Sequence, residues 1–112
     1  MTERPPTQEK LLVAISAHPL GEQLIRTAHQ LSVDSHAEMF VIYVQTPDRT
    51  RYSSMHAEQV ARTLQLAESL GARVVTVQSK SIPEAILEFA AQEKITKIVI
   101  GKPLRSRWQD IL

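Results

Sequence analysis

Short and almost uninterrupted apolar runs recur along this chain, and they constrain its fold more than any other feature. A strand that is apolar at consecutive positions is typical of a parallel sheet covered on both faces, because a wetted face would require a polar residue at every second position. We therefore expect four buried strands in residues 11–15, 39–44, 73–77 and 97–101. The runs are far shorter than the roughly 20 residues that span a bilayer, so we expect no direct insertion into a membrane.

The segments between the runs carry apolar residues at helical spacing. We expect one helix over residues 20–33 and a second over residues 55–70, which Gly71 ends in a left-handed conformation. A third helix is expected after Ser81, whose hydroxyl can cap its first turn. Residues 105–112 are expected to form a turn that leads into a further helix.

Strands separated by helices pair in parallel through right-handed crossover connections. The order of elements therefore predicts the α/β class, as a three-layer sandwich with a parallel sheet between layers of helices. A length of 112 residues fits a single domain, and a composition of 43% hydrophobic and 22% charged residues is ordinary for a globular one. Residues 1–9 hold two prolines and alternating charges, so we expect a flexible leader or linker there and the domain in residues 10–112.

What the chain lacks excludes several classes of function. Without cysteine there is no disulfide, no cysteine-bound zinc, no iron–sulfur cluster and no thiol nucleophile, and a cytoplasmic location is the default expectation. The net charge of +1 gives no reason to expect nucleic acid as a partner. The four histidines lack the spacing of metal ligands, and no acids, bases and nucleophiles cluster in a catalytic pattern. We therefore expect no metal site and no catalytic residue.

Candidate ligand-binding residues follow the predicted strands, because ligands of open parallel sheets bind outside the carboxyl ends of the strands. The segments at these ends are residues 16–18, 43–45, 78–80 and 101–103. The candidates for ligand or nucleotide binding are Ser16, His18, Tyr43, Gly101 and Lys102. For His18, the alternative is a surface loop residue that touches no ligand.

A basic segment follows the fourth strand. Gly101 and three cations precede an expected helix N-terminus, an arrangement that binds anions such as phosphate. The alternative is that Gly101 turns the chain while the cations are solvated or contact a partner. Trp108 could stack on a base, anchor a partner, or pack a following helix onto the sheet. The candidates for partner or anion contact are Arg105, Ser106, Arg107 and Trp108.

Three longer segments resemble a known family. The alternation of strands and helices, with residues 12–16 as its first strand and residues 97–101 as its fourth, resembles the universal stress protein family. The longer segments are residues 43–47 (YVQTP), 66–72 (LAESLGA) and 96–108 (TKIVIGKPLRSRW), and with residues 26–28 (RTA) they resemble one domain type within that family. The last segment most specifically resembles the domain of this family in KdpD-type sensor histidine kinases of bacteria. The resemblance covers residues 10–112 and implies the fold of universal stress proteins and adenine-nucleotide alpha-hydrolases, with five parallel strands in the order 3-2-1-4-5.

The resemblance also implies a regulatory function without catalysis. In KdpD-type kinases this domain lies in the cytoplasmic part of a protein anchored in the inner membrane, and it regulates a response to potassium or osmotic stress. The implied partners are other domains of the parent kinase, a separate universal stress protein, or a small ligand. The alternative is a nucleotide-binding universal stress protein that binds ATP or cyclic di-AMP.

Departures from the nucleotide-binding members bear on that alternative. Ser16 stands near the position of an Asp in ATP-binding members, and Leu104 fills a glycine position where backbone approaches phosphate. For cyclic di-AMP, Ser16 and Tyr43 match the pattern that the resemblance implies, whereas His18 and residues 39–41 differ. The departures therefore weigh against ATP in the standard mode and give cyclic di-AMP no clear support.

The usual fifth strand of the family is not expected in this sequence. Without it, residues 98–100 would lie on an exposed apolar edge, which folded proteins cover or pair. We therefore expect either a last strand that was cut off or is disordered, or a homodimer that protects this edge.

Overall fold

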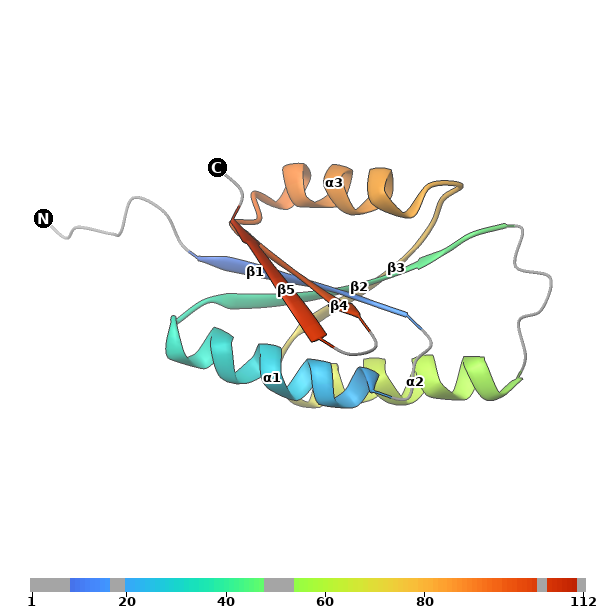
Figure 1. Cartoon of the computed structure of the whole chain (residues 1–112), viewed down its shortest axis with the longest axis horizontal. Helices are drawn as coiled ribbons and strands as arrows, with labels where there is room; N and C mark the ends of the chain where they lie inside the picture. The colour runs from blue at the N-terminus through green and yellow to red at the C-terminus, as the bar shows by residue number, and fades with distance from the viewer. Residues whose placement is uncertain (1–8, 17–19, 48–53, 103–104, 111–112) are drawn as a thin grey trace, which may run out of the picture.

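The computed structural model describes residues 9–16, 20–47, 54–102 and 105–110, and for residues 54–55, 101–102 and 105–110 it describes the backbone alone (Figure 1). Strands and helices alternate along the chain until a final pair of strands. In order, the elements are β1 (Lys10–Ile15), α1 (Gly21–Asp34), β2 (Glu38–Gln45), α2 (Ser54–Ser69), β3 (Arg73–Gln78), α3 (Ile82–Glu93), β4 (Lys97–Lys102) and β5 (Arg105–Asp110).

The strands form one sheet in the order β3-β2-β1-β4-β5, and the first four are parallel. This confirms the predicted α/β class and the four predicted strands. β1 lies at the centre, where Leu12 pairs with Phe40 on β2 and with Ile98 on β4. Six consecutive residues of β2 are buried, which explains why its sequence is apolar without alternation.

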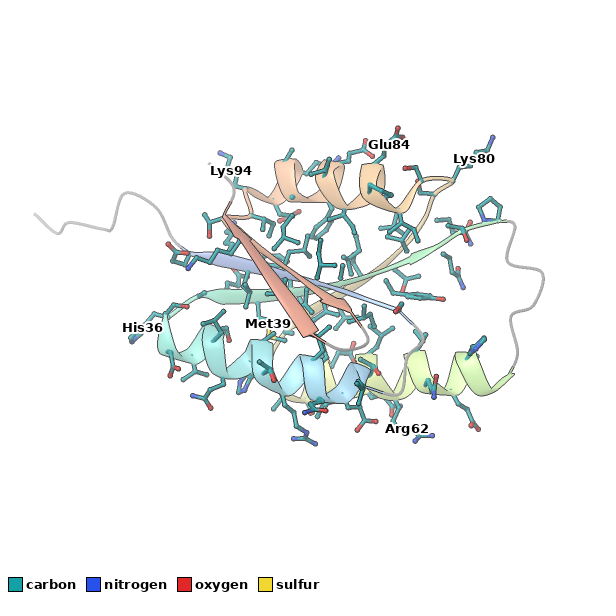
Figure 2. All side chains as sticks on the ribbon, in the orientation of Figure 1. His36, Met39, Arg62, Lys80, Glu84 and Lys94 are labelled. Carbon is teal, nitrogen blue, oxygen red and sulfur yellow. The ribbon has the colours of Figure 1, made fainter. Side chains whose placement is uncertain are left out.

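Helices cover both faces of the sheet, with α1 and α2 on one face and α3 on the other (Figure 1). Alternate residues of each strand enter the two cores: Leu11 and Val13 face α1 and α2, whereas Leu12 faces α3. Side chains fill the space on either side of the sheet, where Met39 lies among them, while Arg62 points outward from the helical layer (Figure 2). The predicted three-layer sandwich is therefore present.

Two helix boundaries follow the predicted chemistry. The Ser81 hydroxyl caps α3 by accepting a hydrogen bond from the Glu84 backbone N–H at 3.3 Å, and Pro83 occupies the first turn. Gly71, which follows α2, has a φ of +91°, a conformation that residues with a Cβ rarely adopt. Both predictions are confirmed.

The prediction of a helix after Arg105 is wrong, because residues Arg105–Asp110 form the strand β5. β5 pairs antiparallel to β4, from Lys102 opposite Arg105 to Lys97 opposite Asp110. An uncovered β4 would present a row of unpaired N–H and C=O groups, and a short connection can supply only an antiparallel neighbour, since a parallel one needs a crossover of a dozen residues or more.

β5 therefore changes the expectation for the sheet edge. The parallel fifth strand of the family is absent from the described residues, as expected, but the outer edge of β4 is paired within the chain. The homodimer was predicted because the edge of β4 was expected to be open and apolar. That edge is paired with β5, so this reason no longer holds, and the homodimer itself stays a prediction.

Candidate functional site

The carboxyl ends of the parallel strands bring the predicted ligand residues to one edge of the sheet. Ile15 pairs with Tyr43, and Ala14 pairs with Ile100, so the positions of Ser16, Tyr43 and Gly101 lie on three neighbouring strands. Ser16 follows β1 directly and is exposed. Strand order thus assembles the candidates as the sequence predicted, with the exception of His18, which lies outside the described residues.

Tyr43 has a structural role in addition to its predicted one. Its side chain is only 3% exposed and belongs to the core between the sheet and the pair α1 and α2, together with Ile15 and Val60. The hydroxyl oxygen is also buried. A ligand at this edge would therefore reach Ser16 before Tyr43, and contact with Tyr43 stays a prediction.

Two glutamines extend the same edge across β2 and β3. The Gln78 amide donates to the Gln45 side-chain oxygen at 3.4 Å, and the Ser79 backbone N–H donates to the Gln45 carbonyl at 3.0 Å. Gln78 is exposed and Gln45 is half-buried. Both lie in the strand-end segments that the parallel order predicted, residues 43–45 and 78–80, although neither was among the individual ligand candidates.

The described residues of the basic segment lie at the end of β4 and the start of β5, which pair as a hairpin. Its backbone register places Lys102 opposite Arg105 and Gly101 opposite Ser106, so two cationic residues are neighbours at the carboxyl end of β4. The predicted anion site required a helix N-terminus after Gly101, and β5 replaces that helix. The helix-based anion site is therefore wrong, while an anion or partner contact of the cations themselves stays a prediction.

The remaining contact candidates lie farther along the hairpin. Arg107 is opposite Ile100, and Trp108 is opposite Val99. Directly opposite residues of an antiparallel pair share one face of the sheet. Val99 belongs to the core beneath α1 and α2, and Ile100 to the side of α3, so the register divides Arg107 and Trp108 between the two faces.

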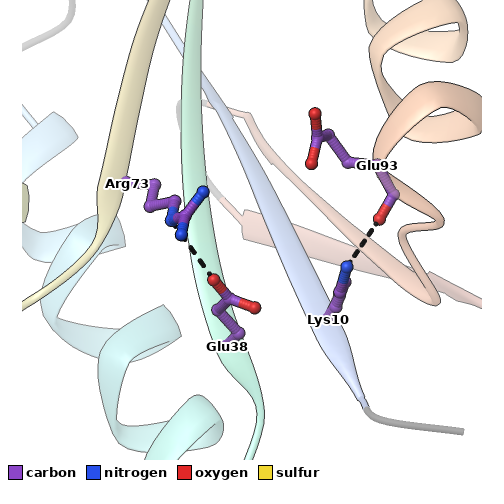
Figure 3. A network of polar contacts seen from close by, with 4 residues as sticks. All are labelled: Lys10, Glu38, Arg73 and Glu93. Carbon is purple, nitrogen blue, oxygen red and sulfur yellow. Dashed lines mark hydrogen bonds and ion pairs between the residues drawn. The ribbon is translucent and has the colours of Figure 1, made fainter.

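A polar network at the opposite, amino-terminal edge was not predicted. The Thr96 hydroxyl accepts a hydrogen bond from the Lys10 backbone N–H at 3.0 Å and donates to a Glu9 carboxylate oxygen at 3.0 Å. The Lys10 ammonium donates to the Glu93 carbonyl at 3.1 Å, in the last turn of α3 (Figure 3). These hydrogen bonds connect the start of β1 to the residue before β4 and to the end of α3.

Lys10 combines electrostatic and packing contacts. A cation beside the last turn of a helix is favourable because the carbonyls there carry partial negative charge. The ammonium also lies 5.9 Å from the centre of the Phe40 ring, which packs edge to face on Phe89 at 6.0 Å. The Lys10 side chain therefore links the first residue of β1 to α3.

An ion pair joins β2 and β3 at this amino-terminal edge. The Arg73 guanidinium lies 3.3 Å from the Glu38 carboxylate, with side-chain exposures of 73% and 35% (Figure 3). Pairs this exposed contribute at most about 1 kcal/mol to stability. We therefore interpret the amino-terminal edge as structural and the carboxyl edge with the hairpin as the candidate functional region.

Two negative findings hold within the described part of the chain. No group of three or more histidine, aspartate or glutamate side chains lies close enough to hold a metal ion. Within those same residues, no helix has both the length and the apolarity needed to cross a membrane.

Comparison with protein families gives a match over residues 8–112 to the model described as "Universal stress protein family". That match covers almost the whole chain. The chain belongs to the universal stress protein family. Its sheet order and its three covering helices agree with this membership.

Within the universal stress protein family, the chain is similar to part of a sensor kinase. It is 37% identical over 101 residues to the sensor protein KdpD of Mycobacterium tuberculosis and 28% identical over 102 residues to that of Escherichia coli K12. These matches cover 90% and 91% of this chain but only 12% and 11% of the relatives, so the chain spans about an eighth of their length.

Solved universal stress proteins share the fold at lower identity. A family member from Burkholderia pseudomallei superposes with a TM-score of 0.64 at 20% identity, covering 88% of this chain and 85% of that one. A universal stress protein from Archaeoglobus fulgidus, in complex with dAMP, superposes with a TM-score of 0.61 at 18% identity, covering 86% and 82%. At these identities the likeness shows the fold alone.

Proposed function

We propose that this chain is a cytoplasmic regulatory domain of a KdpD-type sensor kinase, that it responds to potassium or osmotic stress, and that it catalyses no reaction itself. The observation that carries the proposal is the 37% identity to a KdpD protein across 90% of the chain. The small share of the relative that is matched supports a domain within a larger, membrane-anchored kinase.

Regulation acts through protein contacts at the β4–β5 hairpin. The register that joins Lys102 to Arg105 concentrates positive charge at the end of the hairpin. Exposed charges of one sign favour oppositely charged partners and set the rate and specificity of association more than its strength. The partner is another domain of the parent kinase or a separate universal stress protein.

The second candidate function is nucleotide binding at the carboxyl edge of the sheet. It is favoured by the neighbouring positions of Ser16 and Gly101 and by the dAMP complex of a fold neighbour. It is opposed by Leu104 at a phosphate-facing glycine position of the family and by the burial of Tyr43. ATP and cyclic di-AMP are the ligands to test.

Thermal unfolding with each nucleotide separates the two functions. A ligand at 100 times its dissociation constant adds about 2.7 kcal/mol to the free energy of unfolding, which is an increase in Tm of roughly 10 °C or more for a domain near this size. Regulation by protein contact predicts no such increase with ATP or cyclic di-AMP. An increase that Gly101→Val abolishes would establish the nucleotide function instead.

Charge reversal tests the contact surface in a KdpD-type kinase that contains this chain. Arg105→Glu with Arg107→Glu should change the ratio of kinase output at low and high potassium, because it inverts the charge of the hairpin. Glu58→Lys with Glu68→Lys, at two exposed positions of α2, is the matched control and should leave the ratio unchanged. An unchanged ratio in the hairpin variant would contradict contact through this surface.

A further inference from the structure

β3 forms an outer edge of the sheet that no other described strand covers. Among the described residues its only strand neighbour is β2, over six consecutive positions without a bulge. Folded proteins protect such an edge with proline, bulges or charged side chains. β3 reads RVVTVQ, and its one charged residue, Arg73, stands at the start of the strand and points to Glu38 on β2 (Figure 3). The rest of this edge therefore has no such protection.

The hydrogen bonds to β2 show which backbone groups of β3 point outward. The Ser79 N–H donates to the Gln45 carbonyl at 3.0 Å. Successive residues of a strand point their N–H and C=O groups to opposite sides, so the odd-numbered residues of β3 bond to β2. Val74, Thr76 and Gln78 therefore direct their N–H and C=O groups away from the sheet, and a further strand would pair with these three residues.

A second copy of β3 matches this edge about a two-fold axis at Thr76. In an antiparallel pair, residues that exchange both hydrogen bonds lie opposite each other, and opposite residues share one face of the sheet. An axis perpendicular to the sheet meets both conditions, because it sets Thr76 opposite itself and Val75 opposite Val77. These two valines are half-buried on the α3 side, so the pairing removes more of their apolar surface from water.

α2 lies beside this edge and presents small side chains to it. Thr63 of α2 lies close against Gly21 of α1, so this side of α2 faces α1, while α2 itself packs on β3. Ala57, Ala61 and Leu64 form a row on the other side of the helix, away from α1 and toward the open edge. We call these three residues the Ala61 row. Ala61 is exposed and the other two are half-buried.

The Ala61 row lies level with Thr76. The step from Ala72 to Thr76 spans about 13 Å along β3, which corresponds to about nine residues of α2 at 1.5 Å each. α2 runs antiparallel to β3, and about nine residues before Gly71 the helix is between Ala61 and Leu64. The axis at Thr76 therefore brings Ala61 of one copy beside Leu64 of the other.

The two α2 helices also fit beside each other at a normal distance. A crossover helix packs over the two strands that it connects, and α2 shares its core with Val41 of β2 and Val74 of β3. Since strands lie about 4.8 Å apart, a helix axis midway between β2 and β3 is about 5 Å from the two-fold axis. The two helix axes are then about 10 Å apart, a distance at which helices pack, and alanines permit that approach.

We propose that two copies of this chain associate through β3 and the Ala61 row about a two-fold axis at Thr76, so that their sheets form one continuous sheet. Thr76 and the Ala61 row are uncharged, so a second copy brings no like charges together, whereas a charged partner would leave its charges without counterparts. The six residues of β3 and the Ala61 row are fewer than the roughly 20–30 residues a side of a standard interface, so the dimer is weak. The inference goes beyond the proposed regulatory role and does not depend on it.

Sedimentation velocity over a dilution series measures the association of the unmodified chain. The chain should sediment as a monomer at low micromolar concentration and shift toward the dimer as its concentration approaches millimolar, as expected for a small interface. A monomer at every concentration would overturn the proposal.

Thr76→Cys tests the position of the axis. The chain has no cysteine, so a single cysteine can form a disulfide only between copies. Opposite residues of a hydrogen-bonded antiparallel pair have Cα atoms about 5.5 Å apart, which a disulfide bridges. Under mild oxidation Thr76→Cys should give mostly linked dimer, whereas Thr27→Cys, at an exposed position of α1, should stay mostly unlinked. Equal linkage in both variants, or none at position 76, would overturn the axis and the pairing with it.

Charge at position 76 tests the pairing itself. Thr76→Lys should raise the dimer Kd tenfold or more, because the axis sets two lysines opposite each other, and Thr76→Glu should do the same. An equimolar mixture of the two variants should associate again, since lysine then faces glutamate, and this recovery separates repulsion from misfolding. Ala61→Arg should weaken the dimer by filling the space between the α2 helices, whereas Ala91→Arg, at an exposed position of α3, should not. A dimer that survives Thr76→Lys, or a mixture that stays monomeric, would overturn the proposal.

Discussion

Gly21 of α1 lies close against Thr63 of α2, and its replacement gives a sharp test of the packing. A Cβ at Gly21 would lie 2.9 Å from the Thr63 hydroxyl oxygen and 3.4 Å from its methyl carbon. Thr63 is only 2% exposed, and its hydroxyl donates to the Gln59 carbonyl at 2.9 Å, so its rotamer is fixed. Gly21→Ala therefore forces either the side chain or the helix to move.

The expected cost can be estimated from two opposing effects. Alanine in a helix is favoured over glycine by up to about 1 kcal/mol, whereas overpacking of a tight contact costs about 1–3 kcal/mol. We expect Gly21→Ala to lower the free energy of unfolding by about 1–2 kcal/mol. In a chain of this size that corresponds to a fall in Tm of roughly 5–15 °C.

A double-mutant cycle in urea tests the cause of the loss. Thr63→Ala removes the two nearest of the three Thr63 atoms that a Cβ at Gly21 would meet and leaves only the Thr63 Cβ at 3.7 Å, so Gly21→Ala should be neutral or stabilising in that background. Gln23→Ala, at an exposed position of α1, controls for helix propensity and should change stability little. If Gly21→Ala stabilises the original chain, or costs the same in both backgrounds, the close approach of α1 and α2 is refuted.

Three further substitutions test single contacts by urea unfolding. Ser81→Ala removes the cap on the Glu84 N–H and should cost about 1 kcal/mol, whereas Ser81→Asp should retain most of it; equal stability would contradict the cap. Thr96→Val leaves the Lys10 N–H without its hydroxyl partner and should cost about 1–2 kcal/mol, and Thr96→Ser should restore stability if the network is real. Gly71→Ala should cost about 1 kcal/mol through backbone strain alone, because nothing lies within 4 Å of the added Cβ, and Gly71→Asn should cost less; the reverse order would refute this cause.

The strands and helices of the sandwich could be predicted because burial dictates their residues. The run in β2 must be apolar at consecutive positions since both faces are covered, and Ser81 and Gly71 carry the local chemistry of helix ends. β5 could not be predicted in this way. Its sequence, RSRWQD, has no strand-like alternation of apolar residues, and its pairing follows from the open edge of β4 rather than from its own composition.

The candidate site was predictable to the extent that strand order determines it. Ser16, Tyr43 and Gly101 lie on neighbouring strands because the sheet is parallel, and no spacing rule was needed. The burial of Tyr43 and the exposure of Leu87 depend on how α1, α2 and α3 lie on the sheet, which the local sequence does not specify. The Lys10 network joins a side chain to a backbone carbonyl 83 positions away, and such pairs leave no local signal.

The central claim is that this chain regulates a KdpD-type kinase, and a domain exchange tests it most directly. The chain replaces the matching 101 residues of the Mycobacterium tuberculosis KdpD protein, to which it is 37% identical, and kinase output is measured at low and high potassium. The Archaeoglobus fulgidus universal stress protein, which shares the fold at 18% identity, serves as the control exchange. We predict that the exchange with this chain preserves the potassium response and that the control exchange loses it. Loss of the response in both exchanges, or its retention in both, would contradict the claim.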